Sequence, residues 1–336
     1  MNILYAIQGT GNGHLSRANS LIPHLCKKGN VDVLVSGKGH QFNLDHPVKY
    51  SVNGLGFYFG QKGGIDWLKS LKNFKLLRFL IDLNRIPWHH YDLIISDFEP
   101  LSALAAKLFK APVVGMSHQY AVMAKDSPKA RKYDKVSQWI LKHYAACEKN
   151  IGFHFEAYQE DIFLPIIRPE IRQAKVSEGK HITVYLPAYG MEQLHQMFGR
   201  FPQVQWEIFS KDCSHSFQQN NCWFHPVEKN HFTQSLIDCQ GLVAGAGFET
   251  PAEALHLGKK LLVIPMRGQY EQSCNAAALE AMGVKVLPQL SEDHLYGLGL
   301  WLQNGKTIHR HYPEQSETIV EHLLGEFLPL ESVLFI

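Results

Sequence analysis

The chain has 336 residues, of which 45% are hydrophobic and 19% charged, and its net charge is +2. At roughly 100–200 residues per domain, this length predicts two domains, and the apolar content excludes a disordered, collagen-like or disulfide-stapled chain. No apolar run approaches the roughly 20 residues that a membrane-spanning helix needs.

The first half of the chain alternates short apolar strands with helices. Strands are predicted at residues 2–7, 31–35, 93–96 and 112–116. Apolar residues at helical spacing predict helices at residues 15–28 and 101–109. Continuous apolar strands that alternate with helices favour a parallel sheet covered on both faces.

The alternation pauses at residues 158–180, where prolines and a polar run indicate a linker, and then resumes. The later strands are predicted at residues 182–186, 204–209, 241–244, 260–264 and 284–287. The later helices are predicted at residues 191–198, 250–257, 271–282 and 314–327. We therefore predict an α/β protein with two doubly wound, Rossmann-like domains facing across a cleft, at residues 1–160 and 181–336, joined by a linker at 161–180. The last helix closes the second domain.

Charge is unevenly divided between the halves. Residues 1–160 carry 20 Lys and Arg against 12 Asp and Glu, whereas residues 161–336 carry 13 against 19. Such a field steers an anionic ligand or an anionic membrane toward the first half. The alternative is uneven surface solvation without a partner.

A glycine loop, Gly9–Gly13, separates the first predicted strand from the first helix. Glycines at this position let backbone N–H groups approach an anion at the helix N-terminus. The loop is not a dinucleotide fingerprint, because His14 takes the place of the last glycine. The alternative is a turn needed only for a tight junction, but His14 and Arg17 at its mouth favour binding. The candidate anion-binding residues are Gly11, Asn12 and Gly13.

A second glycine turn follows the strand at residues 241–244. The free amides at the start of the next helix would point at an anion without any metal. The candidate residues are Gly245, Gly247, Phe248, Glu249 and Thr250. Glu253 lies in the first turn of that helix, where a carboxylate also complements the helix dipole. The loop after the next strand places three polar side chains beside this turn: Gln269, Glu271 and Gln272.

Other motifs point to no further site. Residues 115–119 lack the second glycine of a nucleophile elbow. The histidine pairs at 89–90 and 309–311 have no acidic or cysteine companions. We therefore predict no metal site.

The strongest likeness to a known family lies after the second glycine turn. It covers about 35 residues, in which these match in order and spacing: Gly245, Glu253, Gly258, Pro265, Glu271-Gln272 and Asn275-Ala276. This segment is similar to the donor motif of GT-B glycosyltransferases, and the whole chain resembles that two-domain class, especially the peptidoglycan lipid-intermediate N-acetylglucosaminyltransferase and the UDP-glycosyltransferases. Gly9–His14 matches their glycine loop more loosely. Ala244 and Ala246 stand where members often have His or Ser, and Glu271-Gln272 replaces a common Asp-Gln pair.

The resemblance implies a nucleotide-diphosphate sugar, UDP-linked, bound by the second half. Residues 245–250 would cradle the diphosphate and Glu253 would hold the ribose. The loop that carries Gln269, Glu271 and Gln272 would contact the transferred sugar.

Sugar transfer with inversion needs a base for the acceptor hydroxyl. His14 is the candidate, because histidine in general titrates near neutral pH. Asp97, after the strand at residues 93–96, would orient the ring and stabilise imidazolium. The alternatives are that Asp97 caps the following helix and that His14 only binds phosphate. Without a carboxylate cluster, we expect metal-independent transfer and no cofactor.

Residues 67–80 combine an apolar stripe with Lys69, Lys72, Lys75 and Arg78. A basic amphipathic helix can lie on anionic lipid, which would suit a lipid-linked or glycan acceptor. The alternative is an ordinary domain helix.

The leading prediction is an inverting glycosyltransferase. A UDP-N-acetylglucosamine 2-epimerase is the alternative enzyme, and a non-catalytic nucleotide-sugar-binding protein is the third reading. Six cysteines without a C-x-x-C pair suit a reducing compartment. We expect a cytoplasmic protein, peripheral on the inner membrane surface, with no nucleic-acid partner.

Overall fold

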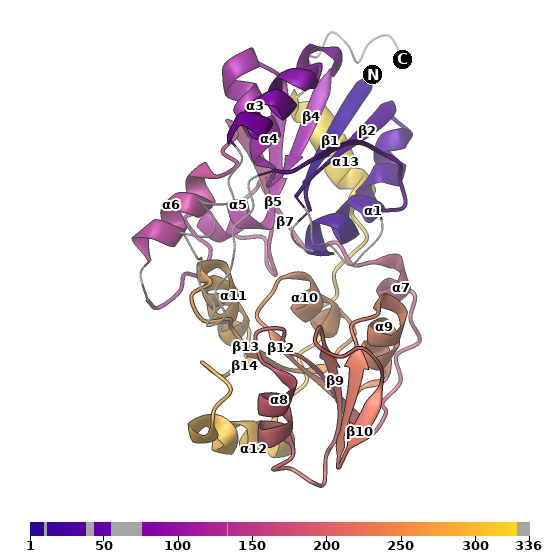
Figure 1. Ribbon diagram of the computed structural model, residues 1–336, viewed down its shortest axis with the longest axis vertical. Coiled ribbons are helices and arrows are strands. Elements are labelled where there is room, and N and C mark those ends of the chain that lie inside the picture. The colour runs from indigo at the N-terminus through magenta and orange to yellow at the C-terminus, as the bar shows by residue number, and fades with distance from the viewer. Residues whose placement is uncertain (10–11, 38–43, 55–75, 133, 328–336) are drawn as a thin grey trace.

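The computed structural model describes residues 1–9, 12–37, 44–54, 76–132 and 134–327. These residues form two seven-stranded sheets, one in each half of the chain, with helices on their faces (Figure 1). The predicted α/β class with two Rossmann-like halves is confirmed. No described helix is long and apolar enough to cross a membrane.

The first sheet is wholly parallel, in the order β3-β2-β1-β4-β5-β6-β7. The strands of this sheet are β1 (Asn2–Gln8), β2 (Asn30–Ser36), β3 (Val48–Val52), β4 (Leu93–Asp97), β5 (Val113–Ser117), β6 (Lys149–Phe153) and β7 (Ile162–Phe163). The helices of this half are α1 (Asn12–Cys26), α3 (Leu76–Arg85), η1 (Trp88–His90), α4 (Pro100–Phe109), α5 (His118–Met123) and α6 (Lys135–His143).

The second sheet has the order β10-β11-β9-β8-β12-β13-β14, and only β10 runs antiparallel to its neighbour. The strands of this sheet are β8 (His181–Tyr185), β9 (Gln205–Ser210), β10 (Phe217–Gln219), β11 (Cys222–Pro226), β12 (Gly241–Gly245), β13 (Lys260–Ile264) and β14 (Lys285–Val286). The helices that follow the first sheet are α7 (Pro169–Arg172), α8 (Met191–Phe198), α9 (Lys229–Asp238), α10 (Glu249–His256), α11 (Tyr270–Ala281), η2 (Glu292–His294), α12 (Leu295–Asn304) and α13 (Ser316–Phe327).

Both sheets reverse strand order at a central strand. β1 lies between β2 and β4, and β8 lies between β9 and β12. Residues 3–7 of β1 are fully buried, as expected for a strand covered by helices on both faces. At such a strand the following connections turn to opposite sides of the sheet. A crevice therefore opens at the carboxyl end of the strand, where ligands of this fold class bind.

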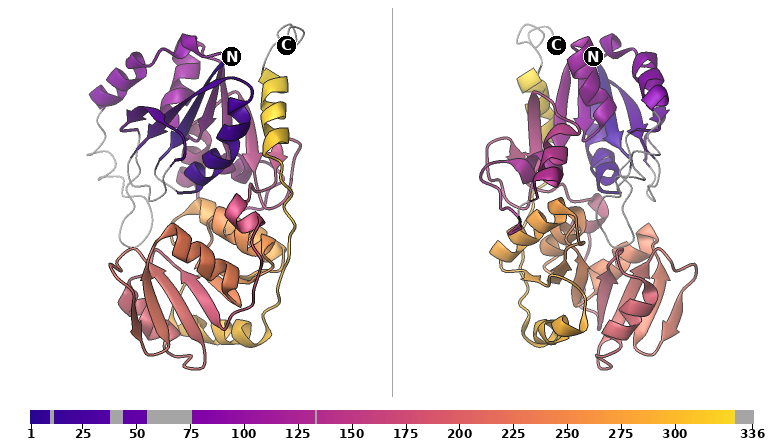
Figure 2. Two further views of the ribbon diagram at one scale, coloured as in Figure 1. Left: turned by 90° about the vertical axis from the view of Figure 1, so that its right-hand side faces the viewer. Right: turned by 60° about the vertical axis from the view of Figure 1, so that its left-hand side comes forward.

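The segment predicted as a linker contains two short elements. β7 pairs with β6 at the edge of the first sheet, and α7 follows it. The last helix, α13, was predicted to close the second domain, but it packs against α1 of the first half (Figures 1 and 2). Ile319, Val320 and Leu323 are fully buried there. They share one hydrophobic cluster with the buried apolar side of α1, so the last described helix lies on the first half.

Candidate active site

Two neighbouring strands of the first sheet bring a histidine and a carboxylate together. His14 lies in the first turn of α1, directly after the glycine loop, and Asp97 is the last residue of β4. β1 and β4 are parallel neighbours, with Ile7 paired to Asp97. Because their carboxyl ends meet at one edge of the sheet, the two side chains touch although they are 83 residues apart in sequence.

The His14 imidazole makes a short hydrogen bond to Asp97. Nδ1 of His14 lies 2.7 Å from Oδ1 of Asp97. A carboxylate only accepts hydrogen bonds, so the proton of the neutral ring sits on Nδ1 and Nε2 is left as an acceptor. The Asp97 side chain is fully buried, whereas that of His14 is 12% exposed. The Nδ1 side of the ring is therefore held by a buried carboxylate, while part of the His14 side chain remains accessible.

Arg17 fixes the same carboxylate. Its Nε and Nη2 atoms donate to Oδ2 and Oδ1 of Asp97 at 3.0 and 2.7 Å, and the Tyr5 hydroxyl donates to Oδ2 at 3.3 Å. Burial alone would raise the pKa of Asp97, but the charge of Arg17 and the hydrogen bonds from His14 and Arg17 hold it below its usual value. Asp97 is therefore ionised and can stabilise imidazolium on His14.

The second half contributes the turn between β12 and α10. β12 ends at Gly245 and α10 begins at Glu249, with no side-chain cap on its first amides. A Cβ atom added at Gly247 would meet no described atom within 4 Å. The backbone is therefore open at a helix N-terminus, where N–H groups and the helix dipole favour an anion.

The Glu249 carboxylate reaches across to the first half. Its Oε1 atom lies 3.4 Å from Nη1 of Arg17. A Cβ atom added at Gly13 would overlap the same carboxylate, so a larger residue there would displace the Glu249 side chain. A carboxylate therefore already lies at the N-terminus of α1, the position where an anion is stabilised.

Both halves line one cavity of about 280 Å³, near the lower end of ligand-pocket volumes. The lining residues of the first half are Gln8, Gly13, His14, Arg17, Phe98, His118, Gln119 and Tyr144. The lining residues of the second half are Gly247, Phe248, Glu249, Gln269 and Glu271. The structure thus brings residues from both predicted glycine turns, and from the loop after β13, to one place.

Several predicted residues lie elsewhere. Glu253 accepts two hydrogen bonds from the Arg168 guanidinium, at 2.6 and 2.9 Å, and both side chains are buried. Arg168 in turn lines a second cavity of about 220 Å³. The Gln272 side chain accepts a hydrogen bond from the Met266 amide at 2.8 Å. Neither Glu253 nor Gln272 lines the larger cavity.

For Asn12 and Thr250, the structure gives the position in the backbone. Asn12 is the first residue of α1, and Thr250 is the second residue of α10. Gly11 lies outside the described residues.

The sequence analysis missed His118 and Gln119, which follow β5. His118 is buried, stacks on Phe248 with ring centroids 4.0 Å apart, and places Nε2 2.8 Å from Asn275 Oδ1. Burial lowers the pKa of His118 to about 4, so the ring is neutral near pH 7. Gln119 donates to Glu271 at 3.1 Å. Polar residues directly after a predicted strand were the available signal, because the carboxyl ends of parallel strands face the ligand.

Two aromatic residues also line the cavity without having been predicted. Phe98 follows Asp97 with a φ of 52°, a region rarely adopted by bulky side chains. Its ring lies parallel to that of His14, with centroids 6.5 Å apart. The ring centroids of Tyr144 and Phe98 lie 5.0 Å apart. The strained backbone at Phe98 therefore places an aromatic side of the cavity next to His14.

The charged groups around the cavity differ in character. Arg17 supplies a fixed positive charge, and His14 supplies an acceptor nitrogen. Burial raises the pKa of Glu271, partly offset by the hydrogen bond from Gln119. Together with the open amides near Gly247, this arrangement can take a proton from a hydroxyl and stabilise an anion in the same cavity.

A family model described as "Glycosyl transferase family 1" matches residues 1–298. No curated protein matches the chain. Among solved structures, the fold is similar to that of Acinetobacter baumannii MurG, with a TM-score of 0.52, 14% identity, and coverage of 97% of this chain and 98% of that one.

Two further solved structures share the fold. Glycosyltransferase VinC in complex with DTDP aligns with a TM-score of 0.52 and 14% identity, covering 99% of this chain and 98% of that one. A UDP-N-acetylglucosamine 2-epimerase aligns with a TM-score of 0.56 and 15% identity, covering 97% of this chain and 96% of that one. At these identities the likeness establishes a shared two-sheet architecture.

Proposed function

The chain belongs to glycosyl transferase family 1, and we propose that it moves a sugar from a UDP-linked donor to a hydroxyl acceptor with inversion. The observation that carries this proposal is the His14–Asp97 hydrogen bond in a cavity completed by the open turn of the second half. Inverting transfer requires a base for the acceptor and charge stabilisation on the leaving diphosphate. His14 and the open amides near Gly247 are the groups we propose for these two tasks.

His14 is the proposed base. Its Nε2 atom would accept the proton of the acceptor hydroxyl as the new glycosidic bond forms and the bond to the diphosphate breaks. Asp97 would then stabilise the imidazolium, and Arg17 would keep Asp97 ionised and oriented. A positioned base of this kind contributes roughly 10²–10⁴-fold to a rate.

The donor is proposed to span the two glycine turns. The amides of Gly245–Thr250 would bind the diphosphate from the second half, and Gly11, Asn12 and Gly13 would face it from the first. Gln269, Glu271 and Gln272 would contact the sugar. Support comes from the position of Gly247, Gln269 and Glu271 on the cavity wall, and from VinC, a neighbour in fold whose structure contains DTDP.

Glu253 is proposed to hold the ribose hydroxyls together with Arg168. The carboxylate is occupied by the guanidinium on both oxygens, but each oxygen can accept a second hydrogen bond. Arg168, but not Glu253, lines the cavity of about 220 Å³. This role therefore requires Arg168 and Glu253 to act as a pair.

Transfer is proposed to need no metal. Helix amides and the Arg17 guanidinium would take up the negative charge that develops on the leaving diphosphate. Preorganised donors of this kind contribute several kcal/mol in other enzymes, about 3–4 for a single donor.

The acceptor is proposed to be lipid-linked or a glycan. Residues 67–75 of the predicted basic helix lie outside the described residues, and the remainder begins α3. In α3, Leu77 and Leu80 are 74% and 42% exposed. An exposed apolar face on a helix that also carries Arg78 and Arg85 favours contact with an anionic membrane surface at the cytoplasmic face.

Calorimetric titration with nucleoside diphosphates and their sugars, with and without EDTA, tests the donor assignment. We expect one nucleotide to bind, with UDP first, and EDTA to leave its affinity unchanged. An NMR assay of the anomeric configuration of a product made with lipid and glycan extracts then tests inversion. Absence of binding by every nucleotide sugar would contradict the proposal.

A 2-epimerase is the second candidate, because acid–base groups surround the cavity on several sides. His14, Glu249 and Glu271 all line it, and a 2-epimerase shares the architecture. Conversion of the donor to its epimer without any acceptor would favour this activity. Tight donor binding without either reaction would indicate a non-catalytic binding protein.

A further inference from the structure

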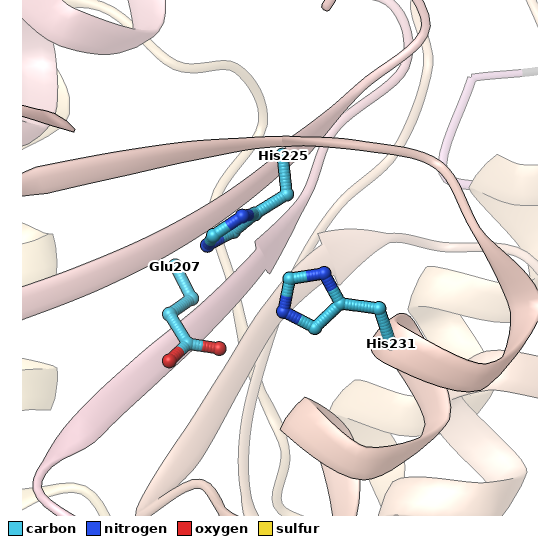
Figure 3. A group of neighbouring side chains, drawn as sticks. All are labelled: Glu207, His225 and His231. Carbon is cyan, nitrogen blue, oxygen red and sulfur yellow. The ribbon is translucent and has the colours of Figure 1, made fainter. Parts of the chain in front are cut away.

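Two histidines and one glutamate converge in the second half of the molecule. Glu207 belongs to β9, His225 to β11 and His231 to α9. Their ligand atoms all lie within 4.8 Å of one another. Figure 3 shows the carboxylate and both rings pointing toward a common centre. Within the described part of the chain, this is the only group of three His, Cys, Asp or Glu residues arranged to hold a metal ion.

The ligand types decide which ion fits. Two imidazoles and a carboxylate suit Zn²⁺ and its neighbouring divalent transition metals, whereas Ca²⁺ and Mg²⁺ prefer oxygen ligands throughout. With bonds of about 2.0–2.1 Å, tetrahedral Zn²⁺ holds its ligand atoms about 3.4 Å apart. The observed spacing, up to 4.8 Å, is wider than this, so the three side chains would have to draw together around the ion.

His225 is oriented by a neighbour. Its Nδ1 atom lies 2.9 Å from the Ser216 hydroxyl, so Nε2 is the nitrogen left to bind an ion. A hydrogen bond to the second ring nitrogen is the usual way in which a metal-binding histidine is held.

Glu207 also has an outer contact. Nε2 of His181, in β8, lies 3.5 Å from Oε2 of Glu207. The same nitrogen lies 3.1 Å from the main-chain oxygen of Ser235. The carboxylate therefore lies near His181 of β8 on one side while it faces the two histidines on the other.

We propose that Glu207, His225 and His231 bind one divalent transition-metal ion, with Zn²⁺ as the first candidate, in a site with an open fourth position for water. The ion would tie β9, β11 and α9 together. None of the three residues lines the cavity that holds His14, so the ion would stabilise the second half without entering the transfer reaction.

The test starts from protein stripped of metal by a chelator and dialysed. Titration with Zn²⁺ by calorimetry should give one equivalent, and Zn²⁺ should raise the thermal midpoint by several degrees. Co²⁺ should develop the visible absorption of a four-coordinate centre. Glu207→Gln and His231→Gln should each lower Zn²⁺ affinity at least tenfold, and Ser216→Ala should lower it about 10–100-fold through loss of the contact that orients His225.

His89→Ala is the matched control, because His89 is an exposed histidine in the other half, and it should bind one equivalent as the unmodified protein does. Circular dichroism establishes that each variant is folded. Equal Zn²⁺ affinity in the unmodified protein and in folded Glu207→Gln and His231→Gln would overturn the proposal. Absence of any stoichiometric binding to the unmodified protein would do the same. Nucleotide affinity should be unchanged by the stripping, which separates this site from the proposed donor site.

Discussion

At the carboxyl ends of β1 and β4, the first half of the molecule gathers buried, ion-paired side chains, whereas at the end of β12 the second half presents glycines and backbone amides. His14, Asp97 and Arg17 form the first arrangement. The open turn at Gly247 forms the second. Both sheets reverse strand order at a central strand. The same architecture therefore places paired, buried side chains at one side of the cavity and an open backbone at the other.

Each half also contains a buried arginine that is paired with a carboxylate. Arg17 bonds to Asp97, and Arg168 bonds to Glu253. The first pair touches a histidine on the cavity wall, but neither Arg168 nor Glu253 lines that cavity. Similar ion pairs therefore have different neighbours, and substitutions in each half should have different main effects.

His14→Ala should have the largest effect on activity. Removing the proposed base should lower turnover roughly 10²–10⁴-fold and leave donor affinity nearly intact. Steady-state kinetics and calorimetry on the same preparation measure the two quantities. His89→Ala, an exposed histidine of the same half, should retain full turnover. Unchanged turnover in His14→Ala would show that His14 is not the base, and the two halves would then no longer differ in the way described above.

Glu253→Ala should mainly affect stability. It leaves the Arg168 guanidinium buried without its partner, which typically costs about 3–5 kcal/mol of unfolding free energy. Urea denaturation measures this loss. The double variant Glu253→Met with Arg168→Met should recover much of it, because an apolar pair replaces the buried ions.

Nucleotide binding separates the structural role of this pair from the proposed ribose role. If Glu253 holds the ribose, the stable double variant should still bind nucleotide more weakly, by about 1–3 kcal/mol. Normal nucleotide affinity in the double variant would show that the pair is structural only.

Glu249→Gln should have the smallest effect, and it should strengthen UDP binding, whereas the other substitutions lower activity or stability. Its carboxylate lies against Gly13 and Arg17, where it repels an incoming diphosphate. Loss of one charge near a helix N-terminus is worth about 0.3–1 kcal/mol, so UDP affinity should rise about two- to fivefold. Glu192→Gln, an exposed acidic residue in the first turn of α8, serves as the control. Weaker UDP binding by Glu249→Gln would show that the carboxylate contacts the donor productively.

Sequence periodicity predicted many elements to within a few residues. α8 and β13 have the predicted bounds, and α10 and α11 begin one residue before their predicted starts. These segments are long or strongly apolar, so the spacing of their apolar residues along the chain matches the spacing of the residues that become buried. The expected contact between His14 and Asp97 is also present.

The segment between β9 and β12 was not predicted. β10 and β11 are short, and Gln218 and Gln219 interrupt the apolar pattern of β10. An edge pair of this kind has one side open, so its residues carry little periodic signal. His225 and His231 of the proposed metal site lie in this unpredicted segment, in β11 and α9, so no sequence motif linked them to Glu207 in β9.

The sequence by itself determined the alternation of strands and helices, the two glycine turns and the histidine after the first of them. These features are local, since they depend on period, burial and backbone freedom within a few residues. The tertiary structure alone decided that Glu249 lies against Gly13, that Arg168 pairs with Glu253 and that α13 returns to α1. The partner of a polar side chain is set by which strands and helices become neighbours, and that depends on how the two sheets pack, not on spacing along the chain.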